Sequence, residues 1–107
     1  MIVTATMDSF EKEVFEAEPK TVLLDFYADW CAPCKQQEPV LQSLEEQPDL
    51  KIVKVSVDAC PDIADAFHLH AVPSLYVLQE GKVVSRAGGF QSREEILAML
   101  FQCGAVL

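Results

Sequence analysis

Apolar residues recur along the chain in short blocks, and several of these blocks have the spacing of a β-strand. Thr21 to Ala28 is apolar on both alternating faces apart from Asp25, which is typical of a central strand covered by helices on each side. The other runs predicted as strands are Ile2 to Ala5 at an edge, Lys51 to Val57, Ser74 to Gln79 and Lys82 to Ala87. The last two are separated by Glu80 and Gly81, so we expect them to pair as an antiparallel hairpin.

A second spacing, of three and four residues, predicts helices between these strands. Asp8 followed by Glu11 predicts the N-terminal cap of a first helix, which runs to about Ala17 and ends with the help of Pro19. Its apolar residues, expected to be buried, are Phe10, Val14 and Phe15.

The segment from Pro33 to Gln47 has the composition of a long helix. Pro39 should kink this helix, because a proline removes one backbone hydrogen bond and crowds the preceding turn. The residues expected to form its buried stripe are Val40, Leu41 and Leu44.

Two further helices carry their own start signals. Pro61 stands at the first position of a short helix that runs to about His68. Ser92 and Glu95 form a capping box that opens the last helix. The residues of the last helix expected to face one side are Ile96, Leu97, Leu100 and Phe101.

Strands and helices therefore follow in the order β α β α β α β β α. Strand, helix, strand units with right-handed crossovers imply parallel pairing in the first part, and the late hairpin adds antiparallel pairing. A chain of 107 residues can sustain one hydrophobic core without additional crosslinks. We expect an α/β fold, a three-layer sandwich with a central mixed β-sheet flanked by helices, as a single domain over residues 1 to 107.

The charge balance narrows the set of partners. Lys and Arg number 8 against 17 Asp and Glu, which gives a net charge of −9 at pH 7. Such a field repels phosphate groups, so neither nucleic acid nor an anionic membrane is expected as a partner. No apolar run reaches the length of a membrane-spanning helix, and the first residues lack the pattern of a signal peptide. We expect a cytoplasmic protein, although a mature periplasmic or secreted form would show the same pattern.

Two of the four cysteines, Cys31 and Cys34, form a CxxC pair between the central strand and the long helix. At the start of a helix, free backbone N–H groups and the helix dipole favour an anion such as a thiolate. A thiolate can attack a disulfide, and a second thiol three positions later can resolve the mixed disulfide. This assigns Cys31 as the nucleophile, nearer the helix start and the solvent, and Cys34 as the resolving thiol.

The alternative interpretation of a CxxC pair is that it forms part of a structural zinc site. Zinc requires a second CxxC or a His pair at matching spacing, and Cys60, His68, His70 and Cys103 do not provide one. We expect no bound metal, with both histidines at the surface or at helix ends. Cys60 is either an exposed regulatory thiol or, as we favour, a small buried or capping residue, and Cys103 has no assigned role.

Asp25 is the one charge in the central strand, where an ionised carboxylate is costly unless it is paired or protonated. One interpretation is a carboxylate that is hydrogen-bonded near a strand end. The other is a buried acid with a raised pKa beneath the CxxC helix, which takes the proton of Cys34 as that thiol attacks. Lys54 on the neighbouring predicted strand either modulates Asp25 or is simply solvated.

Asp25 to Lys35 reads DFYADWCAPCK and resembles the active-site signature of the thioredoxin family. Pro39 falls where that family kinks its long helix, and Val72 to Ser74 resembles its cis-proline loop. Gly81 and Gly88 fall at its glycine positions. The order of elements agrees over almost the whole chain, so the resemblance implies the thioredoxin fold.

The resemblance also implies a surface on which client proteins dock. Val72 would offer its backbone to an extended client segment, and Pro73, in cis, would shape the groove beside the sulfurs. The residues placed on this client-docking surface are Trp30, Ala32, Pro33, Ala71, Val72, Pro73 and Gly88. Ala32 replaces the family's usual glycine, so the reduction potential is not predicted, and Tyr27 stands where a tryptophan is frequent.

The activity implied is that of a protein-disulfide reductase, a monomeric dithiol electron carrier with no bound cofactor. Its partners would be client proteins with disulfides and a thioredoxin reductase, which passes on electrons from NADPH. One alternative is an oxidase or isomerase, although Pro33 stands where such proteins often have a histidine, and its reduction potential would be strongly oxidising. Another is a thioredoxin-like binding or assembly subunit, whose function would survive replacement of both motif cysteines.

Overall fold

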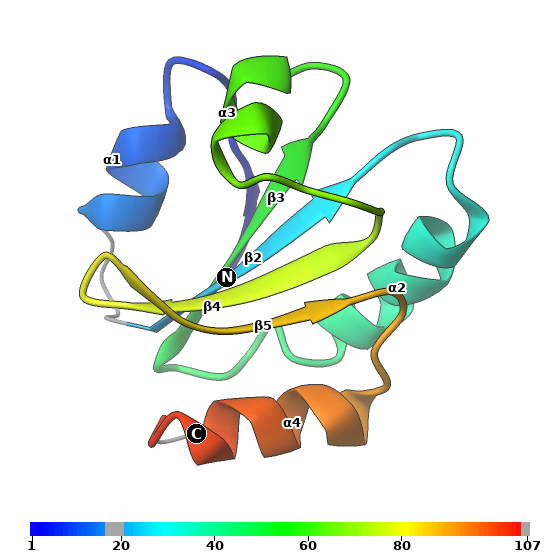
Figure 1. Ribbon diagram of the computed structural model, residues 1–107. Helices are drawn as coiled ribbons and strands as arrows, with labels where there is room; N and C mark the ends of the chain where they lie inside the picture. Colours follow the sequence, from blue (N-terminus) through cyan, green and yellow to red (C-terminus); the bar gives the residue numbers. More distant parts are fainter. Residues whose placement is uncertain (17–20, 106–107) are drawn as a thin grey trace.

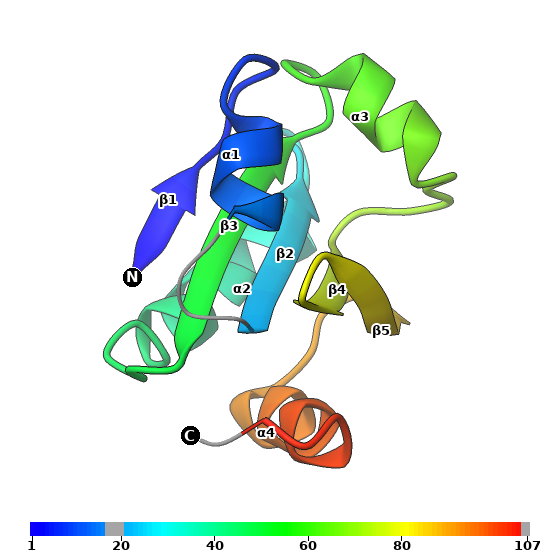
Figure 2. The same ribbon diagram turned by 90° about the vertical axis from the view of Figure 1, so that its left-hand side faces the viewer.

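A computed structural model describes residues 1–16 and 21–105, which form a sheet with helices on both faces (Figure 1). The five strands are β1 (Ile2–Thr4), β2 (Thr21–Tyr27), β3 (Leu50–Ser56), β4 (Ser74–Gln79) and β5 (Lys82–Gly88). Their order across the sheet is β1-β3-β2-β4-β5, which Figure 2 shows from left to right. β1, β3 and β2 pair in parallel, and β4 joins β2 and β5 antiparallel, so the predicted mixed sheet is confirmed.

The helices divide between the two faces of the sheet. The described helices are α1 (Phe10–Phe15), α2 (Ala32–Gln42), α3 (Pro61–Ala66) and α4 (Arg93–Gln102). α1 and α3 cover one face, and α2 and α4 cover the other (Figures 1 and 2). The three-layer α/β architecture expected from the sequence is therefore present.

β2 lies at the centre of the sheet and is buried on both faces, because side chains alternate along a strand. Val22, Leu24 and Phe26 pack with the residues of α1 and α3. Leu23 points the opposite way and packs with Leu41 of α2. By the same alternation, Asp25 lies on the face that α2 covers. The central strand thus carries its one acid toward the helix that begins with the CxxC motif.

The first helix differs from its prediction at its start and in its buried residues. Ser9, and not Asp8, is the N-cap, and its side chain does not cap the helix. Its Oγ instead accepts the N–H of Thr6 at 2.9 Å, while the N–H of Phe10 donates to the Thr6 carbonyl. This local pairing starts the helix one residue late. Phe15 is 48% exposed and not buried, although its ring packs edge-on against Phe10.

The predicted ends at Ala17 and Pro19 lie outside the described residues. α2 ends at Gln42 and not at Gln47, because the chain continues in tighter turns, with the N–H of Leu44 bonded to the carbonyl of Leu41. α3 ends at Ala66 and not at His68, whose φ of 52° is left-handed and cannot continue the helix.

The buried face of α4 is rotated relative to its prediction. Ile96, Met99 and Leu100 are buried, whereas Phe101 is 77% exposed. Phe101 follows Ile96 by five residues, which turns it about 140° away around the helix. The capping box at Ser92 is present as predicted: its Oγ accepts the N–H of Glu95 at 3.1 Å, and the Glu95 carboxylate accepts the N–H of Ser92 at 2.9 Å.

Replacing Ser92 by alanine should lower the free energy of unfolding by about 1 kcal/mol, because one N–H at the start of α4 loses its acceptor. Urea unfolding followed by circular dichroism measures the change. Ser85→Ala on β5 is the matched control, since its hydroxyl caps no helix, and should change stability by less than about 0.5 kcal/mol. Equal losses in the two variants would contradict the capping role.

Candidate active site

The two motif cysteines lie where β2 gives way to α2. Cys31 is the N-cap residue of α2, Cys34 lies in its first turn, and the two form a disulfide with their Cα atoms 5.2 Å apart. The N–H of Cys34 donates to Cys31 Sγ at 3.2 Å. Both residues are buried, 5% and 3% exposed, so exposure to solvent barely separates them. The two cysteines differ instead in their position on the helix, because Cys31 precedes the first turn and Cys34 lies within it.

This geometry stabilises negative charge on Cys31 Sγ in the reduced state. The sulfur already accepts one backbone N–H, and it stands at the positive end of an eleven-residue helix. The hydrophobic residues that pack against the two cysteines are Tyr27, Ala28, Val57 and Val72. A dithiol held this way can exchange electrons by closing and opening one S–S bond.

Asp25 is buried, 1% exposed, and neither of its carboxylate oxygens has a hydrogen-bond partner among the described residues. Burial raises the pKa of Asp25 from 3.8 to about 7, and the nearby Lys54 charge offsets only part of this effect. The hydrogen-bonded carboxylate near a strand end is therefore wrong. Asp25 is a buried acid with a pKa near neutrality, on the sheet face covered by α2.

Lys54 lies opposite Asp25 in the register of the parallel strands β3 and β2. Its ammonium group pairs with Glu38 of α2 and lies 4.5 Å from the centre of the Tyr27 ring. Burial lowers the pKa of Lys54, while Asp25 acts in the opposite direction. Lys54 is thus held under the active-site helix and is not a simply solvated lysine.

A cavity of about 350 Å³ opens beside this cluster and reaches Cys34. Its lining residues are Tyr27, Ala28, Asp29, Cys34, Lys35, Glu38 and Lys54. Cys34 and Lys54 therefore line the same hollow, through which water can reach the interior side of the motif.

The segment before β4 approaches the sulfurs from another direction. The peptide bond between Val72 and Pro73 is cis, as the family resemblance implied, and the Val72 carbonyl oxygen lies 3.5 Å from Cys31 Sγ. Pro73 is buried, whereas Ala71 and Gly88 are exposed. Ala32 and Pro33 are also exposed, at the start of α2.

Trp30 is 71% exposed and borders a hollow of about 530 Å³ together with Ala71 and Val72. Its Nε1 donates a hydrogen bond to Asp58 at 3.0 Å. Asp65, His68 and His70 also line this hollow, so the surface beside Trp30 and Val72 includes an acidic side chain.

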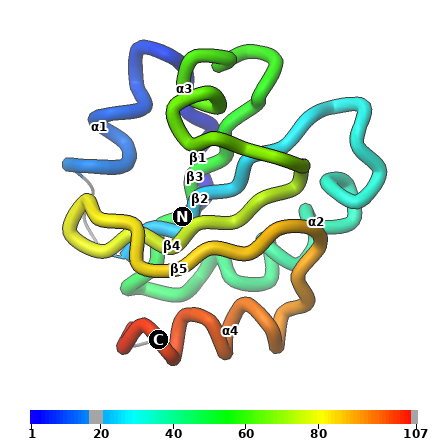
Figure 3. Tube along the Cα trace, viewed as in Figure 1, coloured from blue at the N-terminus to red at the C-terminus, as the bar shows by residue number. Residues whose placement is uncertain are grey.

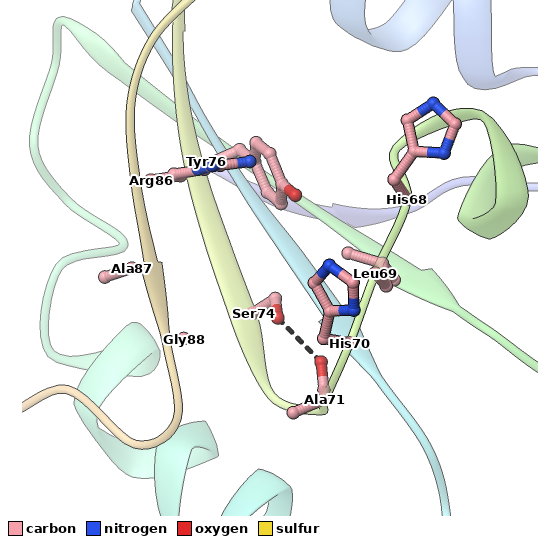
Figure 4. A pocket seen from close by; sticks show the side chains of 9 residues that line it. All are labelled: His68, Leu69, His70, Ala71, Ser74, Tyr76, Arg86, Ala87 and Gly88. Carbon is pink, nitrogen blue, oxygen red and sulfur yellow. Dashed lines mark hydrogen bonds between the residues drawn. The ribbon is translucent and has the colours of Figure 1, made fainter.

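Gly88 lines a second hollow, drawn in Figure 4, which shares the segment from His68 to Ala71 with the hollow beside Trp30. This second hollow has a volume of about 260 Å³ and is bordered by β4 and β5. Ser74 donates a hydrogen bond to the Ala71 carbonyl at its base. Both histidines are exposed, as expected.

The two cysteines outside the motif lie in different surroundings. Cys60 is 1% exposed at the N-cap position of α3, so the buried or capping interpretation is confirmed over an exposed thiol. Burial also raises the pKa of the Cys60 thiol. Cys103 is partly exposed and free. Within residues 1–16 and 21–105, no group of three or more His, Cys, Asp or Glu side chains is arranged to hold a metal ion.

A family model named Thioredoxin matches residues 1–102, from β1 to the end of α4. The chain belongs to the thioredoxin family. Thioredoxin C-2 of Corynebacterium nephridii is 39% identical over 103 residues, which cover 94% of each chain. Thioredoxin of Bacillus subtilis is 41% identical over 97 residues, 89% of this chain and 90% of its own. Thioredoxin of Listeria monocytogenes is 37% identical over 98 residues, 90% and 92% of the two chains.

Family membership and the Cys31–Cys34 disulfide together identify a thiol-disulfide oxidoreductase that reduces protein disulfides. Thioredoxins need no cofactor, since the sulfur pair is itself the redox centre. None of the helices in the described part of the chain is long and apolar enough to cross a membrane.

Sequence reasoning missed three side chains that shape this thioredoxin site. Asp58 holds the Trp30 indole, Glu38 holds Lys54, and Gln37 is buried in α2 with hydrogen bonds to the backbone of Gln91. Gln37 could have been noticed, because it stands four residues before Leu41 on the buried helical stripe. Asp58 and Glu38 look like ordinary surface acids in the sequence, and only the fold supplies their partners.

Replacing Asp25 by asparagine should stabilise the folded chain at neutral and higher pH. Below pH 3.8 the carboxyl group is protonated in both states, and between pH 3.8 and about 7 only the unfolded chain loses this proton. The free energy of unfolding therefore falls as pH rises through this window. Above pH 7 the full cost, about 4 kcal/mol, is present in the wild type and absent in the variant.

Chemical unfolding of the oxidised protein at pH 4 and pH 8 measures this difference. The advantage of Asp25→Asn should be large at pH 8 and small at pH 4. The control is Asp29→Asn, an exposed neighbour, which should follow the wild type at both pH values within about 0.5 kcal/mol. An advantage of Asp25→Asn that does not change with pH would contradict the raised pKa.

Proposed function

We propose that Cys31 is the nucleophile and Cys34 the resolving thiol of the reductase reaction. The Cys31 thiolate attacks one sulfur of a client disulfide, so that a mixed disulfide forms and the second client sulfur leaves as a thiolate. Cys34 then loses its proton and attacks Cys31 Sγ, which releases the first client sulfur. The client gains two electrons, and the Cys31–Cys34 disulfide remains. The observation that carries this proposal is that disulfide at the N-terminus of α2.

Asp25 is the proton acceptor for Cys34 in this proposal. A base is most effective when its pKa lies near the working pH, and the pKa of Asp25 is about 7. The carboxylate lies on the sheet face under α2, and Lys54, opposite it in register, lines the cavity that reaches Cys34. Water in that cavity can relay the proton. Lys54, held by Glu38, keeps a positive charge beside the carboxylate as it ionises or takes up the proton.

Clients dock on the client-docking surface defined above. An extended client segment would run beside Val72, whose carbonyl lies 3.5 Å from the attacking sulfur. Trp30 supplies apolar area, and Ala32, Pro33, Ala71 and Gly88 are exposed, whereas Pro73 is buried. The hydrogen bond from Trp30 to Asp58 keeps the indole in one orientation.

The remaining parts of the proposal concern the surroundings of the protein. A thioredoxin reductase, drawing on NADPH, returns the disulfide to the dithiol, and client proteins with disulfides take up the electrons. The protein acts as a monomer in the cytoplasm, and its net charge of −9 disfavours nucleic acid and anionic membranes as partners.

Replacing both Cys31 and Cys34 by serine should abolish reduction of insulin disulfides in a turbidity assay with dithiothreitol as electron donor. Cys34→Ser alone should form a stable mixed disulfide with a client, because no thiol remains to resolve it. Cys103→Ser is the control and should keep wild-type turnover and form no trapped complex. Undiminished reduction by the double variant would refute the catalytic assignment, whereas a cellular role that survives without reduction would favour a binding subunit.

Asp25→Asn should slow the resolving step by at least about tenfold at pH 7, because the Cys34 proton loses its acceptor. Rapid acid quenching followed by mass spectrometry should detect the mixed disulfide accumulating in this variant and not in Asp49→Asn, an exposed position away from the cavity. Resolution at the wild-type rate, with no mixed disulfide in either variant, would remove Asp25 from the mechanism.

A further inference from the structure

Gln37 is a fully buried polar side chain, 0% exposed, on the helix that carries the reactive sulfurs. It follows Cys34 by three residues and so lies on the same side of α2. Its Nε2 donates to the carbonyl oxygen of Gln91 at 2.9 Å, and its Oε1 accepts the N–H of Gln91 at 2.9 Å. One side-chain amide thus pairs with both backbone groups of a single residue, as a neighbouring strand would.

Further hydrogen bonds connect Gln91 to the client-docking surface. It lies in the connection between β5 and α4, which passes beside α2 (Figure 3). Its own side-chain amide donates to the carbonyl oxygens of Gly88 at 3.3 Å and Gly89 at 3.5 Å. The N–H of Gly89 then donates to the carbonyl oxygen of Pro73 at 2.8 Å.

These hydrogen bonds connect the helix that carries the sulfurs to the two backbone segments that border the client-docking surface, at Val72 and at Gly88. One end of α2 carries Cys31, whose sulfur lies 3.5 Å from the Val72 carbonyl. Six residues after Cys31, Gln37 holds the connection that leads back through Gly89 to Pro73, the residue after Val72. The positions of the Cys31 sulfur and of the two edges, Val72 and Gly88, are therefore all fixed relative to α2.

A buried amide is costly unless it is satisfied, so Gln37 favours the one arrangement of residues 88–91 that pairs all its groups. The connection from 89 to 92 has no regular secondary structure of its own, and Gly89 has a φ of +81° that favours glycine. An apolar residue at position 37 would fill the same space but would make no hydrogen bonds to the backbone of Gln91.

We propose that Gln37 is a positioning residue that holds Gly88 and Val72 in register with the Cys31 sulfur, so that a protein client meets a pre-formed docking surface. This proposal rests on the proposed function, in which clients dock at these residues. Gln37 touches neither the client nor the reacting atoms. Gln37 should therefore affect only substrates large enough to contact the client-docking surface. When such a substrate binds, the loop is already ordered, so binding does not carry the entropic cost of ordering it.

Gln37→Met tests the proposal, because methionine has a similar size and helix preference and no hydrogen-bonding amide. With a protein disulfide as substrate, KM should rise by about threefold to tenfold while kcat stays unchanged, the range expected for loss of one or two neutral hydrogen bonds. The rate with a small aromatic disulfide and the reduction potential should not change. Gln36→Met, the same substitution at the exposed neighbouring position, should match the wild type in every measurement.

Amide hydrogen exchange gives a second readout. The N–H groups of Gly89 and Gln91 should exchange faster in Gln37→Met than in Gln36→Met, while those of β2 and β3 should not. If Gln37→Met does not fold, Gln91→Ala decides, since it removes only the bonds to the Gly88 and Gly89 carbonyls. It should raise KM for the protein substrate by about twofold, a smaller loss than that of Gln37→Met.

An unchanged KM in the variant that folds, or an equal loss of rate with protein and small disulfides, would overturn the positioning role. Each of these results requires an active wild type. Failure of the wild type itself to reduce the protein substrate would instead refute the proposed function, so the two failures are distinguishable.

Discussion

Cys31 occupies the N-cap of α2, directly after a strand that is buried on both faces, and the chemistry of the molecule depends on this placement. β2 is held between β3 and β4, so the point where it ends is set by the sheet. The helix that follows turns the N–H of Cys34 toward the Cys31 sulfur. The second sulfur falls in the first turn, close enough to form the disulfide. The connection between β2 and α2 therefore accommodates the thiolate, the disulfide and the conversion of one into the other.

The central strand also carries the acid that we propose as the proton acceptor. Asp25 points to the α2 face because it stands two residues after Leu23, and the same face is covered by apolar side chains. Burial without a hydrogen-bond partner is what raises its pKa to about 7. The buried carboxyl group therefore lowers the stability of the folded chain at neutral pH, and it lies beneath the helix where we propose that it accepts a proton. Such a conflict between local stability and chemistry is expected at an active site.

Local patterns predicted most of the elements, because each depends on neighbouring residues. The two apolar faces of β2, the capping box of Ser92 and Glu95, and the hairpin at Glu80 and Gly81 are all present. Element ends were less predictable. α1 starts after Ser9 because Thr6 and Ser9 pair with each other, and α3 stops where His68 adopts a left-handed conformation. These choices depend on backbone geometry that periodicity does not encode.

The sequence by itself determined the order of the elements, the place of the CxxC motif between strand and helix, and the presence of one costly acid in an apolar strand. Only the tertiary structure decided which polar groups meet. Lys54 pairs with Glu38, and Gln37 with Gln91, across separations that no local pattern reports. The physical reason is range: periodicity records which face of an element is apolar, whereas a hydrogen bond depends on where another element passes within about 3 Å.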